Sequence, residues 1–402
     1  MPLSGTLRSM VISAREEYRN RIPTNLIHRL PPAPDRLIDL NCVETCGRTA
    51  DSPGAVALYS AATRPQPHRQ PLAGYPKRWT AFESQTVHKH HQLFVMRLDE
   101  ASVSGMFPAV VSHDGRLYVE ISRVHGEPIE THPIYSRSRL PAPTRLAGRT
   151  LLLASAYAGS FYHWMIDTVP RLRLLERARI PLESFEHVIL PAEGGRFIDE
   201  SLACFPRLRA SRHIVNNATH FQCEQLFCPS LPHPVGQADS WGPAFLRRTM
   251  LGPRRRPLGD ERLLLSRATA PRRRVLNEDQ IWREVLKPAG FARLCLDDLP
   301  LGDQVDLVSR AATIVAPHGA ALTHMLFAPR GCSIIELLSP HYPAACFWNL
   351  ADALGNPYRY IVGQIVGSQA LSQARDFEID PEQVWQCLLD VGAPSITGAP
   401  LA

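Results

Sequence analysis

Short apolar runs alternate with segments of helical periodicity through the second half of the chain. The apolar runs predict five strands, at residues 262–266, 292–296, 313–316, 333–337 and 358–362. Helices are predicted between them, from residue 277, near 304–311, at 321–327 and at 344–354. Asn277 is the expected N-cap of the first helix, and Gln280 completes a capping box. This alternation predicts an α/β fold with a parallel, doubly wound sheet.

A second, less regular alternation precedes this one. Residues 107–122 have the pattern of a hairpin around the turn 113–115. Further strands are predicted at 151–154, 188–190 and 224–228, and helices at 161–178, 197–204 and 241–251. Ser160 is expected to cap the first of these helices. We therefore expect an N-terminal α/β domain at 105–251, a linker at 252–257 and a C-terminal α/β domain at 258–365.

The two ends of the chain have a different character. Residues 1–104 are rich in Pro and Arg, and only residues 7–18 have a helical pattern, so we expect an irregular N-terminal region. At the other end, Asp380 and Pro381 predict the start of a last helix. Residues 376–402 should therefore form a C-terminal helix and tail.

Composition narrows the class of protein. The 402 residues are 45% hydrophobic and 20% charged, as in folded globular proteins. No apolar run approaches the ~20 residues that span a bilayer, and no leader pattern opens the chain, so a cytoplasmic protein is expected. The net charge of +6 is too diffuse for nucleic acid binding. It suits phosphate-bearing partners, or peripheral contact with the inner face of an anionic membrane.

Cysteine and histidine patterns give no sign of a metal site. The nine cysteines have no repeated spacing and no CxxC motif, which predicts free thiols in a reducing compartment. The run from His88 to His91, taken with His163, raises a metal-dependent hydrolase as one alternative. Its spacing fits no ordered set of ligands, so we interpret it as an exposed loop and expect no bound metal.

Candidate binding residues follow the predicted strands of the C-terminal domain. Ligands of parallel sheets bind beyond the carboxyl ends of the strands. Arg267 follows the first strand, and Arg272, Arg273 and Arg274 come soon after; their forked guanidinium groups suit phosphate, although a solvated basic loop is the alternative. The turn His318-Gly319-Ala320 follows the third strand and either faces an anion or is simply a tight turn.

Two further features concern carboxylates. Glu336 closes an apolar strand, where a buried acid requires a partner, either a ribose hydroxyl pair or an Arg. In the N-terminal domain, His163 and Asp167 are four residues apart and share one face of the predicted helix. That spacing lets the acid orient the imidazole, or lets either group act as a general base, and a purely structural pair is the alternative.

These motifs, in this order, resemble bacterial members of glycosyltransferase family 61, which are usually labelled capsular polysaccharide biosynthesis proteins. The resemblance covers roughly residues 105–365. It rests on the segments 162–167 with 170–172, 265–267, 273–278, 316–323 and 335–337. The sequence departs from the commoner family pattern in having Pro317 before His318 and Ala321 where a second Gly is frequent.

The resemblance implies a GT-B-like enzyme with two facing Rossmann-type domains. Such an enzyme moves a sugar with inversion from a nucleotide-sugar, expected to be UDP-linked, to a hydroxyl of a glycan or lipid-linked saccharide acceptor. The donor site would comprise Arg267, Arg274 and the turn His318-Gly319-Ala320 at the diphosphate, Glu336 at the ribose, and Asn277. His163 and Asp167 would face the acceptor from the N-terminal domain.

The resemblance also bears on cofactors. The sequence has no Asp-X-Asp triad, and arginines can neutralise a leaving diphosphate, so a metal-independent reaction without a cofactor is expected. A non-catalytic module that binds nucleotide or glycan with the same fold is the alternative to an enzyme.

Overall fold

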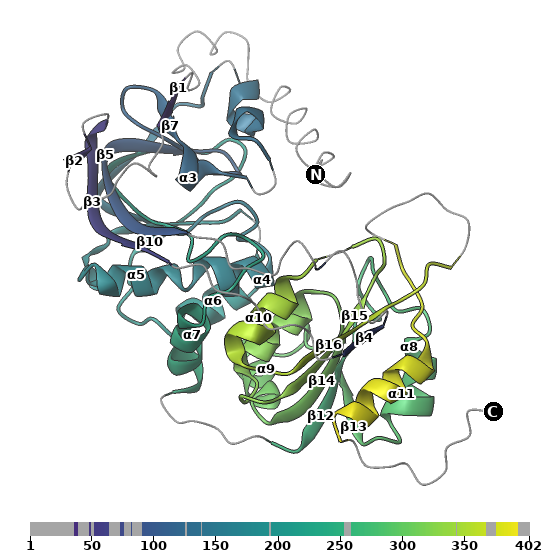
Figure 1. The fold of residues 1–402 in the computed structure, drawn as a ribbon. Coiled ribbons are helices and arrows are strands. Elements are labelled where there is room, and N and C mark those ends of the chain that lie inside the picture. Colours follow the sequence, from purple (N-terminus) through teal and green to yellow (C-terminus); the bar gives the residue numbers. More distant parts are fainter. Residues whose placement is uncertain are drawn as a thin grey trace. The chain divides into compact units, whose positions relative to one another are not determined.

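The computed structural model describes residues 36–38, 48–49, 52–63, 73–75, 82, 91–124, 127–137, 139–192, 194–252, 259–342, 344–366 and 375–392. The helix expected at 7–18 and most of the expected linker lie outside these ranges. The chain divides into two compact units, Met1–Arg64 with His90–Val235, and Pro65–Lys89 with Gly236–Ala402. Figure 1 shows the elements of each unit.

The second unit contains the predicted parallel sheet. Its strand order is β13-β12-β14-β15-β16-β4, and all neighbouring strands are parallel. The strands are β12 (Glu261–Leu265), β13 (Phe291–Leu294), β14 (Ala311–Pro317), β15 (Ser333–Leu338), β16 (Tyr358–Val362) and β4 (Ala73–Tyr75). All five strands expected from the apolar runs are present, and the Rossmann-like topology of this unit is therefore confirmed.

Helices cover both faces of this sheet (Figure 1). On one side lie α9 (Leu301–Val308) and α10 (Cys346–Leu354), and on the other α8 (Glu278–Ile281), which continues into the π-helix η6 (Trp282–Leu286), and α11 (Pro381–Asp390). The unit also contains α7 (Trp241–Leu251) and the 3-10 helix η7 (Ala320–Phe327). Apolar side chains from α8, η6 and α11 pack on the buried strand residues Leu264, Val315 and Ile335.

The first unit is built on a larger, mixed sheet. Its main path is β1-β7-β6-β5-β11-β8-β9-β10, with β3 paired to β5 and β2 to β3. The strands are β1 (Arg36–Ile38), β2 (Arg48–Thr49), β3 (Ser52–Ala62), β5 (Gln92–Ser104), β6 (Ala109–Val111), β7 (Arg116–Tyr118), β8 (Thr144–Leu152), β9 (His187–Leu190), β10 (Ser211–Ile214) and β11 (His220–Pro229). Strands β11, β8, β9 and β10 are parallel, whereas β3, β5, β6 and β7 form antiparallel pairs. The hairpin expected at 107–122 is confirmed as β6 and β7.

The prediction of an irregular region up to residue 104 is wrong for two long strands, β3 and β5. They pair with each other, and β5 also pairs with β11 far along the chain. The prolines around them dominate the local composition, while the strands depend on distant partners: β3 pairs with β5 about 30–45 positions away, and β5 pairs with β11 more than a hundred positions away. The short strand β4 extends the sheet of the second unit by pairing with β16.

Helix starts differ from the sequence prediction in an informative way. Ser160 precedes α4 (Phe161–His163) but its side chain makes no capping hydrogen bond, and Asn277 likewise does not cap α8. Asn277 instead exchanges two hydrogen bonds with the backbone of Ile379, at 2.7 and 3.0 Å. The Asp380 cap is confirmed, because its carboxylate accepts a hydrogen bond from the Glu382 backbone amide.

The segment expected to form one helix over 161–178 is helical in the structure, but it is not α-helical throughout. It runs through α4, the π-helix η4 (Trp164–Thr168) and α5 (Arg171–Arg177), after which α6 (Phe197–Leu202) follows β9. The Val169 amide donates to the Trp164 carbonyl five residues back, at 2.9 Å. Such single π turns occur frequently at functional sites.

The remaining helical segments of the first unit are short. They are α3 (Val119–Ser122) after β7, and the 3-10 turns η2 (Ile129–Thr131), η3 (Pro133–Ser136) and η5 (Leu182–Ser184). Seven cysteines lie in the described ranges, and all seven are free thiols as expected: Cys204, Cys223, Cys228, Cys295, Cys332, Cys346 and Cys387.

Candidate donor and acceptor sites

The strand order of the second unit defines a topological switch point. From β12 the chain moves to β13 on one side and then to β14 on the other. The carboxyl ends of β12 and β14, which are direct neighbours, therefore open where ligands of α/β sheets bind. Arg267 follows β12, and His318 and Gly319 follow β14, so the structure brings these three predicted residues to the same edge of the sheet.

Gly319 provides space for the Arg267 side chain. A Cβ atom on Gly319 would lie 1.9 Å from Arg267 Nη1 and 2.6 Å from its Cζ. The Gly319 backbone is extended, with φ of 172°, so the requirement is for space and not for a left-handed conformation. Glycine at this position therefore lets the guanidinium group lie directly against the β14 turn.

Arg267 lies among other cations. Burial, followed by the charges of Arg273 and Arg272, lowers the pKa of Arg267 from its usual value, with Asp297 acting in the opposite direction. Within the described ranges neither Arg267 nor Arg273 forms an ion pair with a carboxylate, and the Nε atom of each is buried without a hydrogen-bond partner. Partly buried cations that repel one another are an arrangement that a bound anion would stabilise.

A stack of rings connects Arg273 with His318. The Arg273 guanidinium lies 4.1 Å from the centre of the Tyr342 ring, and the Tyr342 and His318 ring centres are 4.9 Å apart. Arg273 has φ of 55°, a left-handed conformation that costs a non-glycine residue about 1–3 kcal/mol. Arg273, which the sequence grouped with two neighbours but did not select, therefore faces the switch point.

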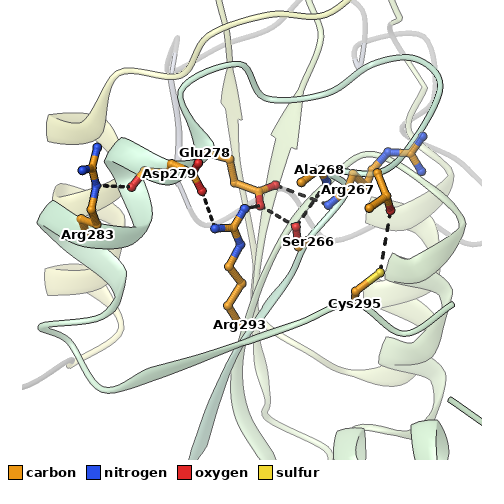
Figure 2. Close-up of polar contacts among 9 residues, drawn as sticks. Ser266, Arg267, Ala268, Glu278, Asp279, Arg283, Arg293 and Cys295 are labelled. Atoms are coloured by element: carbon orange, nitrogen blue, oxygen red, sulfur yellow. Dashed lines mark hydrogen bonds and ion pairs between the residues drawn. The ribbon is translucent and has the colours of Figure 1, made fainter. Parts of the chain in front are cut away.

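Glu278 holds the turn that carries Arg267, as Figure 2 shows. Its buried carboxylate accepts hydrogen bonds from Ser266 Oγ at 2.5 Å and from the Arg267 amide at 3.4 Å. Arg293 donates to the same carboxylate at 2.5 Å and also pairs with Asp279. Glu278 was not predicted from the sequence, where the available signal was an acid in the first helical turn after a basic loop.

His318 and Glu336 form a buried pair. His318 Nδ1 lies 2.5 Å from Glu336 Oε1, and the Tyr358 hydroxyl donates to Glu336 Oε2 at 2.5 Å. Glu336 is fully buried and His318 is 5% exposed. Burial, and then the charge of Glu336, raises the pKa of Tyr358 well above its usual value, which keeps the phenol a donor.

This geometry does not fit the expected role of Glu336 as a ribose ligand. Both carboxylate oxygens accept hydrogen bonds from the protein interior, and neither reaches the surface. Glu336 instead fixes the orientation of His318, since a carboxylate acceptor at Nδ1 leaves Nε2 as the other polar edge of the ring.

Two other expected donor ligands are engaged elsewhere. The Arg274 guanidinium donates two hydrogen bonds to Asp376, at 2.7 and 2.9 Å, and its backbone amide donates a third at 2.8 Å. Asn277 binds the backbone of Ile379. Both residues attach the segment before α11 to the sheet, so neither fits the predicted contact with nucleotide. Ala320 begins η7 directly after Gly319, where the sequence placed it.

The first unit holds the His163–Asp167 pair. His163 Nδ1 lies 2.6 Å from Asp167 Oδ2, so the π turn between them preserves the contact expected from their spacing. The side chain of Asp167 is 3% exposed and that of His163 is 24% exposed. The acid is therefore the inner member of the pair and the imidazole is the outer one.

A second histidine, which sequence reasoning missed, approaches Asp167 from the loop after β11. His233 Nδ1 lies 3.8 Å from Asp167 Oδ1, and His233 is 2% exposed. The two histidines are 70 positions apart in the chain, so local spacing could not pair them. Asp167 thus lies between two imidazoles, and this arrangement restrains the orientation of its carboxylate.

Metal sites and membrane-spanning helices are both absent from the described ranges. There, no three side chains of His, Cys, Asp or Glu are grouped so that they could hold a metal ion. Among the same residues, no helix combines the length and apolar character needed to cross a membrane.

Comparison with known proteins gives a consistent family. Residues 161–335 match the family described as Glycosyltransferase 61. The chain is 37% identical over 83 residues to protein O-linked-mannose beta-1,4-N-acetylglucosaminyltransferase 2 of Mus musculus, covering 20% of this chain and 14% of that protein. The same enzyme of Bos taurus is 34% identical over 115 residues, covering 27% of this chain and 19% of the relative.

A differently named relative points the same way. EGF domain-specific O-linked N-acetylglucosamine transferase of Drosophila melanogaster is 35% identical over 97 residues, covering 24% of this chain and 18% of the relative. The chain thus spans less than a fifth of the length of these relatives. These relatives are animal enzymes, so a bacterial, capsule-related role stays a prediction. The resemblance to glycosyltransferase family 61 is confirmed, over a segment that begins at α4 and ends within β15.

Proposed function

We propose that this chain is an inverting glycosyltransferase that moves a sugar from a UDP-linked donor to a hydroxyl of a glycan acceptor, without a bound metal ion. The family match supports glycosyl transfer in general. The observation that carries the donor assignment is the placement of Arg267 against Gly319 at the switch point, beside Arg273. The GT-B arrangement stays an expectation from the resemblance.

On the donor side, the chain's own cations perform the work that a metal performs elsewhere. The developing negative charge of the leaving diphosphate is stabilised by donors placed in advance. Arg267 and Arg273 supply these donors, and Glu278 holds the Arg267 turn in position. His318, oriented by Glu336, presents its Nε2 edge as a further polar group.

On the acceptor side, His163 is the general base and Asp167 the residue that orients it. Asp167 accepts the hydrogen bond from His163 Nδ1, so Nε2 is the nitrogen that receives the acceptor proton. The acceptor oxygen forms a bond to the anomeric carbon as the bond from that carbon to the diphosphate oxygen breaks. The nucleoside diphosphate leaves with the electron pair, and the proton remains on His163.

Calorimetry and donor turnover test both halves of this proposal. Arg267→Ala should weaken UDP binding by about 10–100-fold, the effect of losing a charged hydrogen bond. Asp167→Asn should leave UDP affinity unchanged and lower release of UDP from the donor by about 10²–10⁴-fold. Arg310→Ala is the matched control: Arg310 immediately precedes β14, at the opposite end of the strand, where it pairs with Glu261 and Asp306.

The outcomes separate the alternatives. Normal UDP binding and normal turnover in both variants would refute the site assignment. Selective UDP binding without turnover of any UDP-sugar would favour the non-catalytic binding module. Loss of UDP binding in EDTA would contradict metal independence, whereas EDTA-insensitive binding and turnover support it.

A further inference from the structure

A small pocket with a volume of about 20 Å³ opens in the first unit at the carboxyl ends of β8 and β11. These strands are parallel neighbours, so the pocket occupies the position at which parallel sheets bind ligands. Its lining includes Glu120, Arg123, Ser155, Ala156, Arg171 and Ser230. The residues come from α3, the loop after β8, α5 and the loop after β11.

The wall formed by Arg171 is rigid. Its guanidinium group donates to the carbonyls of Leu152, Leu153 and Pro229 at 2.9–3.1 Å and so joins the ends of both strands. Burial lowers the pKa of Arg171 to about 10, which leaves it a cation at neutral pH. The pocket is therefore built before any ligand arrives.

Tyr157 follows the pocket wall directly and has an unusual backbone. Its φ is 68°, a left-handed conformation that costs an aromatic residue about 1–3 kcal/mol. Its ring centre lies 5.5 Å from that of His163 and 6.2 Å from that of Phe107. A strained residue, next in sequence to the pocket residue Ala156, therefore places an aromatic ring beside the proposed base.

Two other aromatic residues beside His163 are less accessible than Tyr157. Trp164 is fully buried and Tyr162 is 8% exposed, whereas Tyr157 is half-buried. The resemblance implies acceptor contacts from the 161–178 helix, at His163 and Asp167. In the structure Tyr162 and Trp164 belong to the core and Phe161 packs edge to face on Phe197, whereas Tyr157 of the preceding loop lies beside His163.

We propose that Tyr157 and this pocket form the binding site for the acceptor saccharide. A sugar ring stacks on the Tyr157 face, and one of its hydroxyl groups enters the pocket, which has room for a group the size of a water molecule and is lined by Glu120, Arg123 and Ser155. The reacting hydroxyl then lies near His163. This inference rests on the proposed function, because it assigns the acceptor class to the same base.

Replacing Tyr157 by glycine removes the ring and leaves a residue that adopts positive φ without strain. Tyr157→Gly relieves this backbone strain but loses the packing of the ring on Phe107, so the melting temperature of each variant is measured beside binding. The test is binding of wild type, Tyr157→Phe and Tyr157→Gly to an array of synthetic oligosaccharides, together with hydrolysis of UDP-sugars without acceptor. We expect glycans bound by wild type and Tyr157→Phe to bind Tyr157→Gly about tenfold more weakly.

Hydrolysis distinguishes a sugar platform from a residue that only supports His163. Water needs no stacking surface, so Tyr157→Gly should lose sugar transfer to a bound glycan by a larger factor than it loses hydrolysis of the donor; equal losses of both would overturn the proposal. Equal glycan binding by wild type and Tyr157→Gly would also overturn it, as would absence of glycan binding by wild type that binds UDP. If wild type failed to bind UDP while Tyr157→Gly still lost glycan binding, the proposed function would be contradicted and the assignment of the acceptor site would stand.

Discussion

At the scale of single residues, the proposed donor site depends on one hydrogen atom in place of a methyl group. Gly319 lets the Arg267 guanidinium occupy space that any larger side chain would take. The atom in conflict is the far end of a flexible side chain, so a substitution here should displace the cation without unfolding the sheet.

Gly319→Ala should therefore weaken UDP binding by about tenfold or more, with a melting temperature close to that of wild type. Gly302→Ala is the matched control, because a Cβ on Gly302 in α9 meets nothing within 4 Å. Titration calorimetry with UDP measures the effect. Wild-type affinity in Gly319→Ala would show that the position of Arg267 is unimportant for nucleotide.

A second test at this scale concerns Glu336. If Glu336 acts by orienting His318, then Glu336→Gln and Tyr358→Phe should each weaken the binding of both UDP and inorganic pyrophosphate by at least about threefold. If Glu336 bound the ribose instead, the two substitutions would weaken the binding of UDP and uridine and leave the affinity for pyrophosphate unchanged. Tyr358→Phe matters here because removing a buried carboxylate can destabilise the fold, whereas the phenylalanine variant retains the ring. Calorimetry with the three ligands decides between the two roles.

At the scale of elements, side chains distant in sequence attach the segment before α11 to the parallel sheet. Arg274 holds Asp376, and Asn277 holds Ile379, beside the bridge between Val275 and Phe377. Arg274 therefore joins two segments of the protein and does not bind a ligand, so Arg274→Ala should leave UDP affinity unchanged.

The same ion pair predicts a pH dependence of stability. Burial opposes ionisation of Asp376, but the hydrogen bonds and charge of Arg274 outweigh it and lower the pKa of Asp376. A folded-state pKa below the unfolded value stabilises the fold above about pH 4 and loses this effect as pH falls through the folded pKa. Asp376→Asn should cost up to about 1 kcal/mol at pH 7, because the pair is partly exposed.

Urea unfolding at several pH values checks this expectation. The difference in unfolding free energy between wild type and Asp376→Asn should shrink between pH 5 and pH 3. A difference independent of pH would mean that the carboxylate charge does not contribute.

At the scale of the whole molecule, donor and acceptor functions are assigned to different compact units. The donor residues Arg267, Arg273 and His318 all belong to the second unit, and His163, Asp167 and Tyr157 all belong to the first. Nucleotide and glycan should therefore act on different segments of the chain.

Hydrogen exchange tests this division. UDP should slow exchange most strongly at residues 266–273 and 318–322, which follow β12 and β14. A bound oligosaccharide should act mainly on residues 155–163. Nucleotide protection centred on residues 155–163 would contradict the assignment of the donor to the second unit.

The sequence alone determined five strands of the parallel sheet of the second unit; the edge strand β4 was not among them. It could do so because buried strands and amphipathic helices carry their own periodicity, and parallel order brings the carboxyl ends of β12 and β14 to one edge. The His163–Asp167 contact was predictable for the same reason, since a helical turn fixes which residues meet.

Only the tertiary structure decided which predicted ligands stay available. Arg274, Asn277 and Glu336 have the right residue types, but their hydrogen-bonding partners Asp376, Ile379 and Tyr358 lie 22–102 positions away. Tyr157 and His233 could be recognised only in the structure. Tyr157 has a left-handed backbone and lies beside His163, and His233 reaches Asp167 from the loop after β11. The local sequence pattern predicts helices and strands. The hydrogen-bonding partner of each polar side chain, in contrast, comes from elsewhere in the chain and is decided by folding.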